Sequence, residues 1–412
     1  MDFDLDDPML LWSDEVLADP RPLYDRLRRD APVWRLPGQQ TYLVSDPGLI
    51  REAVTRPDDL SSNLVSVVHL DEVGRPVTFE MGTVGDPMHV LATADPPAHA
   101  RHRKLLQPHL SPAALAGLEP ALRDIVDEQL APLLAAGGGD VVTALANAVP
   151  ARVICHVIGI SQQHAPFVME RVSATAPLMD GVADLDGMVG AGTAALDLME
   201  FAQTQFVAAR DMPASERTGL LSVLVAAIEA GVLDDDEARN LLVLLFNAGT
   251  ETTSSLIANT IETVARDSEL QDGLRRDPER IPSALEDVLR DDGPFQFHYR
   301  WSTADVDLGG TRIPANSRVL LMWAAGNRPS PDEAGASDGS GDAVTATHLA
   351  FGRGLHFCIG APLARLEARV AIAHLLASTS RIRLDAAHPP ARFRSIFLRR
   401  HVSLYVLVDQ PS

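Results

Sequence analysis

The feature that most constrains this 412-residue chain is a ten-residue run near its C-terminus, Phe351-Gly352-Arg353-Gly354-Leu355-His356-Phe357-Cys358-Ile359-Gly360. A lone cysteine stands between glycines, and Ala361-Pro362 then begins a helical pattern with proline at a favoured first-turn position. Free N–H groups and the helix dipole at such a start would stabilise a thiolate. Glycines let the backbone approach a large flat group without a Cβ clash. The run therefore predicts a thiolate held beside such a group.

Two interpretations of this run differ in what the cysteine does. Axial ligation of a haem iron is the chemistry that needs a thiolate in this setting. The alternative is a buried structural cysteine in a tight turn, as most isolated cysteines are. Cys358 alone favours the structural interpretation, whereas the whole pattern favours the iron ligand. The other cysteine, Cys155, lies in the apolar stretch ARVICHVIGI and is predicted to pack in the core.

Charge and cysteine content exclude several classes of protein. The chain carries 35 Lys and Arg against 56 Asp and Glu, and its net charge of −21 argues against nucleic acid or an anionic membrane as the main partner. Two cysteines cannot form a disulfide framework, which favours a reducing compartment. The N-terminal MDFDLDDPMLLW lacks the basic region of a signal peptide, and no apolar run approaches the ~20 residues of a membrane span. We therefore expect a cytoplasmic protein.

Hydrophobic periodicity predicts a mostly helical chain with a few short strands near each end. The longest predicted helix opens at Asp234–Glu237, which places acids at its positive end, and carries LLVLLFNAGTETTSSLIANTIETVARD. Residues 60–89 and the Gly-, Ser- and Asp-rich meander at 329–349 are expected to be irregular. Residues 190–195 fit a dinucleotide-binding pattern but follow no predicted strand, so we reject that site. Further helices are predicted over 21–30, 281–292 and after Cys358, and strands over 41–46 and 403–408.

In their order along the chain these motifs resemble the cytochrome P450 superfamily, specifically its soluble bacterial members. The resemblance runs from the first helix to the last strand. It implies a mainly α fold with a small β-rich lobe, formed as a single domain over residues 1–412. It also implies haem b (iron protoporphyrin IX) as the cofactor, with the Cys358 thiolate as the axial iron ligand. The implied activity is a monooxygenase that inserts one atom of O2 into a hydrophobic small molecule.

The resemblance assigns a distal role to one stretch of the long helix, Ala248-Gly249-Thr250-Glu251-Thr252. In the family an acid–alcohol pair here feeds protons to bound oxygen, and the matching pair is Glu251–Thr252. Glycine costs ~1 kcal/mol in mid-helix, and room for dioxygen against the backbone would explain Gly249. The Thr252 hydroxyl can bond back to the carbonyl of Ala248 and bend the helix open. The alternative is an ordinary buried helix with threonines on a polar seam.

Cations at four positions match the family's contacts to the haem propionates. His99 and Arg103 lie four residues apart on a predicted helix, and Arg300 and His356 match two further contacts. Cations facing a dianionic cofactor edge would make charge-assisted hydrogen bonds, which explains the residue types. Taken singly, each would be a solvated surface charge. The rest of the implied cofactor site comes from the cysteine run itself: Phe351, Gly352 and Gly360.

The helix IPSALEDVLRDD departs from the family pattern, which has Glu-x-x-Arg here, bonded to a third arginine in the meander. Alignment through Arg290 puts the shorter Asp287 at the acid position, with Glu286 as a substitute partner four residues before the arginine. The expected structural ion pair is Asp287–Arg290, and the sequence alone does not decide between the two acids. The meander contains no arginine, so the network is expected to be smaller than usual.

The family's substrate-contact regions map onto mostly apolar positions, as a pocket for a hydrophobic molecule requires. The alternative for each of them is core packing. The expected substrate-contact residues are Leu64, Val65, Leu91, Phe246, Asn247, Phe297 and Phe397.

The resemblance further implies a monomer that receives electrons from NAD(P)H through a ferredoxin reductase and a ferredoxin. A local cationic face at Arg101, Lys104, Arg353 and Arg365 would steer an acidic ferredoxin. Two rival functions remain at this stage. One is peroxide-driven or another unusual oxidation at the same site, against which the Glu251–Thr252 pair argues. The other is a haem-binding sensor without catalysis.

Overall fold

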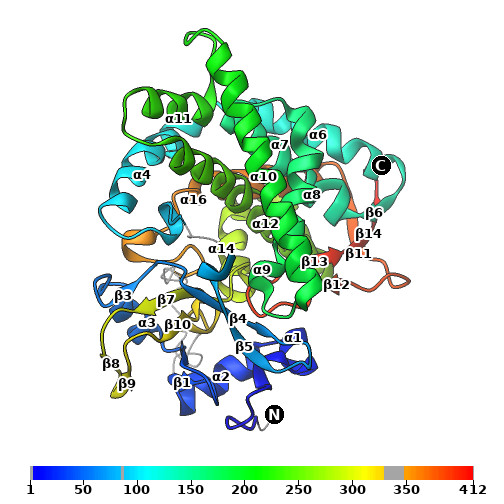
Figure 1. Cartoon of the computed structure of the whole chain (residues 1–412). Helices are drawn as coiled ribbons and strands as arrows, with labels where there is room; N and C mark the ends of the chain where they lie inside the picture. Colours follow the sequence, from blue (N-terminus) through cyan, green and yellow to red (C-terminus); the bar gives the residue numbers. More distant parts are fainter. Residues whose placement is uncertain (1–2, 85–87, 329–347, 412) are drawn as a thin grey trace.

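The computed structural model describes residues 3–84, 88–328 and 348–411. Helices build the larger part of the molecule, and the N-terminal segment with short sheets builds the smaller part (Figure 1). This is the mainly α fold with a β-rich lobe that the sequence predicted. The helices are α1 Asp14–Ala18, α2 Arg21–Asp30, α3 Pro47–Ala53, α4 Ala98–Leu106, α5 Pro112–Leu115, α6 Glu119–Ala135, α7 Ala148–Ile158, α8 Ala165–Thr175, α9 Pro177–Asp180, α10 Leu185–Asp211, α11 Gly219–Glu229, α12 Asp235–Arg266, α13 Ser268–Arg276, α14 Ile281–Asp292, α15 Trp323–Gly326 and α16 Ala361–Ala377.

A five-stranded sheet in the order β1-β2-β10-β7-β3 forms the centre of the β-rich lobe. Its strands are β1 Val33–Arg35, β2 Thr41–Val44, β3 Leu60–Ser61, β7 His298–Ser302 and β10 Arg318–Leu321. Strand β10 runs parallel to β2 and antiparallel to β7, so the sheet joins segments almost 280 residues apart, as the bond between Arg318 and Thr41 shows. This sheet places β7, and with it Arg300, next to the helical part.

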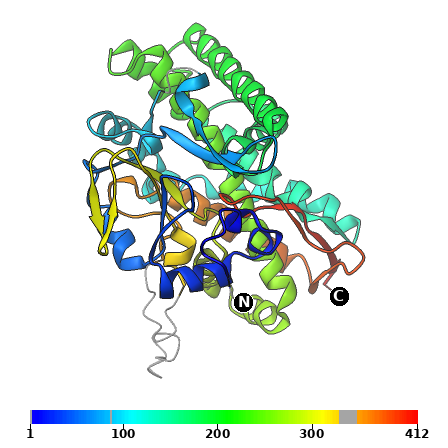
Figure 2. The same cartoon turned by 60° about the horizontal axis from the view of Figure 1, so that its bottom comes forward.

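The C-terminal strands form a second sheet in the order β11-β14-β6, which lies at one edge of the molecule (Figure 2). It consists of β6 Gly138–Asp140, β11 Arg381–Leu384 and β14 Tyr405–Asp409. Strand β6 was not among the strands predicted from the sequence. Two further two-stranded sheets are β8 Val306–Leu308 with β9 Thr311–Ile313, and β12 Ala391–Arg392 with β13 His401–Ser403.

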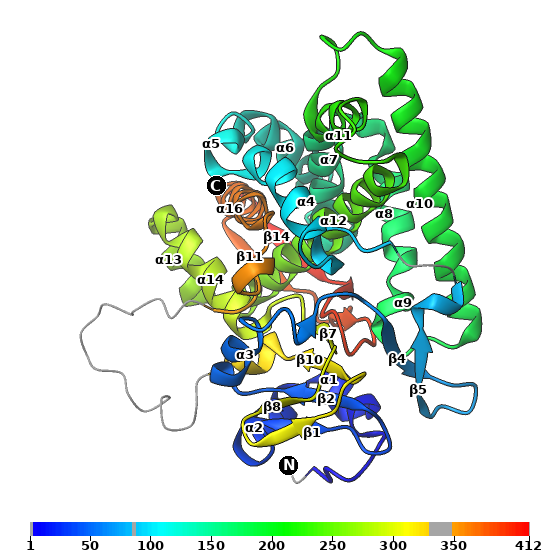
Figure 3. The ribbon, with the colours of Figure 1, turned by 60° about the vertical axis from the view of Figure 1, so that its left-hand side comes forward.

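Helix α12 is the central element of the helical part and packs against α7, α8, α10, α14 and α16 (Figure 3). Asp234 caps it by accepting a 2.7 Å hydrogen bond from the N–H of Glu237, and three acids occupy its first turn. Among the described residues it is the one helix whose length and composition would suffice to cross a membrane, but 61% of its most apolar window is buried inside the protein. That burial is typical of a core helix.

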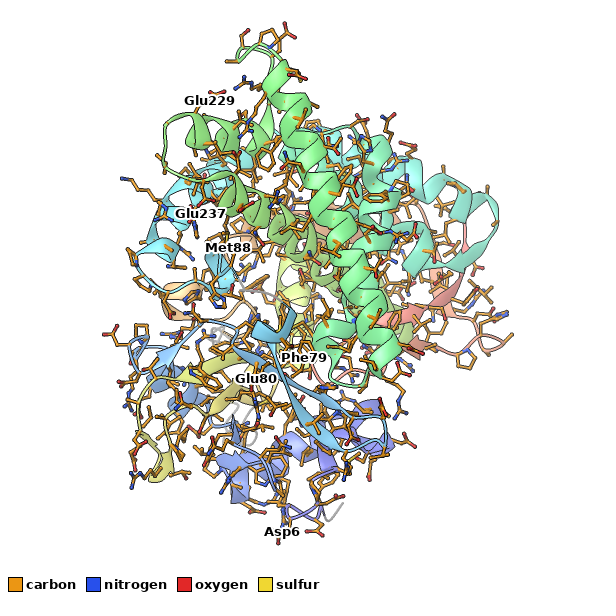
Figure 4. The ribbon with its side chains drawn as sticks, in the orientation of Figure 1. Asp6, Phe79, Glu80, Met88, Glu229 and Glu237 are labelled. Atoms are coloured by element: carbon orange, nitrogen blue, oxygen red, sulfur yellow. The ribbon has the colours of Figure 1, made fainter. Side chains whose placement is uncertain are left out.

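The expectation for residues 60–89 was wrong. Residues 60–89 were predicted to be irregular, but β4 Ser66–Leu70 and β5 Pro76–Glu80 form an antiparallel hairpin. Phe79 and Glu80 lie at the end of β5 in Figure 4. A loop closed by the Asp71 carboxylate, which accepts from the N–H of Arg75, and by Gly74 at φ +77° connects the strands. The β-branched residues on both sides of a glycine-containing turn were the signal for this hairpin. Of the predicted meander, 329–347 lies outside the described residues.

Candidate active site

The cysteine run forms a tight loop between the meander and α16. The N–H of Cys358 donates to the carbonyl of Phe351 at 2.9 Å, and the N–H of Phe357 donates to that of Gly354 at 3.1 Å. Gly352 and Gly354 have φ of +68° and +72°, a region that strongly favours glycine. A Cβ on Gly354 would also lie 3.3 Å from the carbonyl oxygen of Val54. These glycines therefore shape the loop that presents the sulfur.

Opposing influences act on the Cys358 thiol. Burial raises its pKa, whereas hydrogen bonds from the backbone N–H groups of Gly360 and Ala361, and the charges of Arg103 and Arg365, lower it. The N–H groups belong to the start of α16, as the sequence predicted. A bound metal cation would remove the thiol proton outright, and these donors would then stabilise the thiolate. Cys155 has no such surroundings: it is fully buried in α7, and burial raises its pKa to about 12.

A cluster of cationic side chains lies beside the loop. The rings of His99 and His356 are 4.2 Å apart between centroids, and Arg300 is only 7% exposed. Burial and the neighbouring cations lower the pKa of His356 to about 3, and burial lowers that of Arg300 to about 10. Nδ1 of His99 and both ring nitrogens of His356 are buried without a hydrogen-bond partner among the described residues. Buried donors with this charge fit a ligand that brings carboxylates.

Arg103 acts on the cysteine loop itself. Its Nη1 donates to the carbonyl oxygens of Leu355 at 3.2 Å and Phe357 at 2.8 Å, and its Nε donates to Gln107. Part of its hydrogen-bonding capacity is therefore used to hold the loop from α4. The sequence placed Arg103 with His99 at the cofactor and gave no indication of this second contact.

In residues 248–252 of α12 the structure shows one expected hydrogen bond and an unexpected contact at the glycine. The hydroxyl of Thr252 donates to the carbonyl of Ala248 at 2.8 Å, as anticipated. Gly249, however, faces α7: a Cβ there would lie 2.6 Å from Cδ1 of Ile154. The absence of a side chain therefore permits close packing of α12 on α7, a reason for this glycine that the sequence did not indicate.

Glu251 belongs to a buried acid–arginine–acid triad. Its Oε1 lies 2.9 Å from Nη1 of Arg400, whose Nη2 lies 2.6 Å from Oδ2 of Asp180. The three side chains are 11%, 7% and 6% exposed, and the guanidinium stacks 3.9 Å from the ring centre of Phe393. Burial raises the pKa of Glu251 to about 7, with Arg400 opposing the rise and Asp180 adding to it. Sequence reasoning missed Arg400 and Asp180, which lie far from Glu251 along the chain.

The two acids of α14 have different partners, and only one of the pairs is the expected one. Asp287 does contact Arg290, at 2.7 Å, but its side chain is 62% exposed, so this pair lies at the surface. Glu286 instead accepts two hydrogen bonds from Arg365, at 2.7 and 2.8 Å, and lies 2.9 Å from Nε2 of His348. Burial opposes its ionisation, but these partners lower its pKa to about 2.

Glu286 rather than Asp287 therefore ties α14 to the cysteine region. Arg365, on α16, also stacks 4.4 Å from the ring centre of Phe351. The expected Asp287–Arg290 pair is therefore present, but it is exposed and does not form a buried network. Neighbouring positions on a helix point about 100° apart, and the spacing to Arg290 does not say which of them faces inward.

The expected substrate-contact residues lie in different surroundings. Leu64 and Val65 are half-buried, whereas Leu91, Phe297 and Phe397 are at most 9% exposed. Phe246 is fully buried with its ring centre 5.7 Å from that of Phe201, which makes it a core residue. The Asn247 amide is occupied: it donates to Val243 and accepts from Thr175.

The predicted cationic face is reduced by internal pairing. Arg101 forms an ion pair with Glu237, which Figure 4 shows at the start of α12, and Arg365 is held by Glu286. Lys104 and Arg353 are exposed and have no acidic partner among the described residues. Of the four predicted cations, these two present a charge at the surface that no acid among the described residues offsets.

The fold and site together define a haem-thiolate protein: one cysteine at a helix start, and buried cations placed to receive carboxylates. Comparison with known proteins agrees. A family model described as Cytochrome P450 matches residues 186–380, and Cytochrome P450 144 of Mycobacterium tuberculosis is 36% identical over 404 residues, or 98% of this chain and 92% of that protein. The chain belongs to the cytochrome P450 family. It is a monooxygenase of bacterial type, and its cofactor is a haem ligated by cysteine.

Two further relatives span nearly the whole chain. Beta-dihydromenaquinone-9 omega-hydroxylase of Mycobacterium tuberculosis is 31% identical over 407 residues, or 99% of this chain and 78% of that protein. The crystal structure of CYP109E1 from Bacillus megaterium in complex with testosterone has a TM-score of 0.83 and 26% identity, and covers 96% of this chain and 99% of that one. The predicted P450 fold is confirmed.

Proposed function

We propose that this chain, acting as one domain over residues 1–412, inserts one oxygen atom from O2 into a hydrophobic small molecule. Its electrons come from NAD(P)H through a ferredoxin reductase and a ferredoxin, and it works as a monomer in the cytoplasm. The observation that carries the proposal is the combination of the Cys358 loop with the buried triad at Glu251. When bound, the haem supplies the activation of dioxygen, and the protein supplies orientation, protons and a dry pocket.

Residues on three elements would hold the cofactor. Cys358 ligates the iron, and His99 and His356, with unpartnered ring nitrogens, donate to the carboxylates beside Arg300. Buried Arg300 has no carboxylate in hydrogen-bond contact among the described residues; Asp95 acts on it only through its charge and bonds Ser61 and Ser62 instead. Two carboxylates would accept from these ring nitrogens and neutralise the buried charge of Arg300, which no hydrogen-bonded acid among the described residues compensates.

Glu251 and Thr252 would deliver protons on the distal side. An arginine between two buried carboxylates leaves one negative charge in excess, which favours retention of a proton on one of the acids. With a pKa of about 7, Glu251 can both hold and release that proton near neutral pH. Thr252, the next residue, offers a hydroxyl whose own hydrogen donates to Ala248 and whose oxygen can accept. This arrangement favours oxygenation over a sensor without catalysis.

The substrate class is inferred from the aromatic side chains near β7. The rings of Phe295 and Phe397 lie 5.1 Å apart between centres, and Phe297, which is 1% exposed, supports Phe397 from the core. Such walls suit an apolar molecule. The names of two similar proteins are consistent with an apolar substrate: one is named for a menaquinone derivative, and one was solved in complex with testosterone.

The electron donor is inferred from Lys104 and Arg353, the unpaired exposed cations near the cysteine loop. On a protein of net charge −21 such a local site would direct an acidic ferredoxin to this face and raise its association rate.

Three measurements test the proposal. The reduced, CO-bound protein should give the spectrum of a thiolate-ligated haem. A surrogate ferredoxin, its reductase and NADPH should then support product formation from a compound whose binding shifts the haem Soret band to the blue. A thiolate spectrum without oxygenation of any compound that produces this shift would favour the sensor, and full turnover with peroxide alone would favour the peroxide-driven enzyme.

A further inference from the structure

His298 is a half-buried imidazole that the proposed function does not yet use. It is the first residue of β7 and pairs with Leu321 of the neighbouring strand β10 (Figure 1). Because side chains alternate along a strand, His298 and Arg300 point to the same face of the sheet. Arg300 lines the same hollow as His356 of the cysteine loop. His298 therefore lies at the cofactor side of the β-rich lobe.

One hydrogen bond fixes the tautomer of His298. Nε1 of Trp323, at the start of α15, donates to Nδ1 of His298 at 2.6 Å. An indole N–H is a donor only, so Nδ1 must accept and the ring proton must reside on Nε2. Burial, and then the charge of Arg300, lower the pKa of His298 to about 3, so the ring stays neutral at working pH.

The fixed Nε2–H is not used within the protein. It makes no hydrogen bond to any of the described residues, although the ring is only partly accessible. Aromatic rings surround it: the ring centres of Phe295 and Phe397 lie 4.5 and 5.9 Å from that of His298. A single neutral donor among apolar rings is what a binding site uses to orient a largely hydrophobic molecule that carries one polar group.

We propose that His298 is a specificity-determining residue whose Nε2–H, oriented by Trp323, donates a hydrogen bond to an oxygen acceptor on the substrate. The proposal rests on the proposed function and narrows its substrate class to apolar molecules that carry a carbonyl or ether oxygen at the end facing Phe295 and Phe397. Such a donor also disfavours pure hydrocarbons, because a hydrocarbon that packs on the ring displaces water from Nε2–H without replacing its hydrogen bond.

The cofactor's carboxylates are the other possible acceptors near β7. The unpartnered ring nitrogens of His99 and His356 and the guanidinium of Arg300 already supply donors to that position. The aromatic rings in contact with His298, in contrast, leave its donor facing apolar surroundings. The substrate is therefore the acceptor that the contacts favour, and the carboxylate becomes an outcome of the test.

The test compares matched ligand pairs on the ferric holoenzyme. Cyclododecanone with cyclododecane, and cyclohexyl phenyl ketone with cyclohexylphenylmethane, differ only in the carbonyl oxygen. Binding is followed by calorimetry and by the Soret shift. The wild type should prefer the ketones about five- to tenfold, the effect of one hydrogen bond, and His298→Phe should reduce the preference to within about twofold. Trp323→Phe should reduce it partly, because the tautomer is then no longer fixed.

Tyr299→Phe is the matched control, since it removes a buried polar group from the next position of β7, where Tyr299 accepts from the N–H of Val68. It should keep the full preference. A wild type without preference for either ketone, including one that binds no member of either pair, overturns the proposal. Haem loss in His298→Phe with an unchanged ketone preference also overturns it. In that case Nε2–H of His298 donates to a carboxylate of the cofactor and not to the substrate. The CO spectrum of the wild type tests the haem-thiolate function separately.

Discussion

Oε1 of Glu251, on the central helix α12, lies 2.9 Å from Nη1 of Arg400, which follows 149 residues later in the chain. This contact joins the distal helix to the C-terminal region, and Asp180 on α9 completes it from the other side of the guanidinium. Because Arg400 is shared between two carboxylates, a change at either acid alters the proton affinity of the other. The proton affinity of Glu251 is therefore determined by residues from three separate segments of the chain.

The first prediction concerns the pH dependence of coupling, measured as product formed per NADPH consumed. Protonated Glu251 is the donating form, so coupling should fall as pH rises through its pKa of about 7. The Asp180 charge raises that pKa, so Asp180→Asn should move the midpoint about one pH unit lower. Arg400 lowers it, so Arg400→Gln should move the midpoint higher. Arg400→Lys keeps the cation and should stay near the wild type. Two shifts in the same direction would contradict the triad.

Thr252 is predicted to control whether reduced oxygen ends in product. Thr252→Ala removes the hydroxyl beside Glu251, so NADPH should still be consumed while hydrogen peroxide replaces product. Positioned proton donors typically contribute ~10²–10⁴-fold to rate, so the loss of product should be large. Thr252→Ser retains the hydroxyl and should retain most of the coupling. Unchanged coupling in Thr252→Ala would transfer the role to a substrate hydroxyl or to water.

Cys358 is predicted to be the sole iron ligand from the protein. Cys358→Ser should abolish the thiolate spectrum of the reduced CO complex, because a serine oxygen is not deprotonated and does not replace the sulfur donor. Cys155→Ser, which changes a core residue of α7 with a pKa of about 12, should leave the spectrum intact. The reverse result would show that the loop assignment is wrong.

The acid of α14 that stabilises the cysteine region is predicted to be Glu286. Its pKa in the folded protein is about 2, below the ordinary 4.5, so its contribution is complete above 4.5 and is lost as pH falls toward 2. At neutral pH Glu286→Gln should lower the free energy of unfolding by about 2–3 kcal/mol and increase haem loss during gel filtration. Asp287→Asn, at an exposed pair, should change stability by less than about 0.5 kcal/mol. Greater haem loss in Asp287→Asn would restore the original assignment.

The sequence was informative where interactions are local. The cysteine loop closes within ten residues, and its glycines, proline and helix start were all visible in the pattern. Helix α12 was also predictable from its cap and periodicity. Asp180 and Arg400, in contrast, meet across 220 residues through the tertiary fold, and no local signal connects them. The packing role of Gly249 was not predictable for the same reason, because the residue it must accommodate, Ile154, belongs to another helix.

The last prediction concerns the entry of electrons. Of the four predicted cations, Lys104 and Arg353 are exposed and have no acidic partner among the described residues, whereas Arg101 is bound to Glu237. Steering depends on net local charge, so Lys104→Gln and Arg353→Gln should each slow reduction by a ferredoxin about 3- to 10-fold at low salt and flatten its salt dependence. Arg101→Gln is the control: its cation is already paired, so its effect should be smaller. Stopped-flow reduction at low and high ionic strength measures both. If Arg101→Gln slowed reduction as much as the other two, the ion pair with Glu237 would not screen that charge; if none did, the ferredoxin would bind at another face.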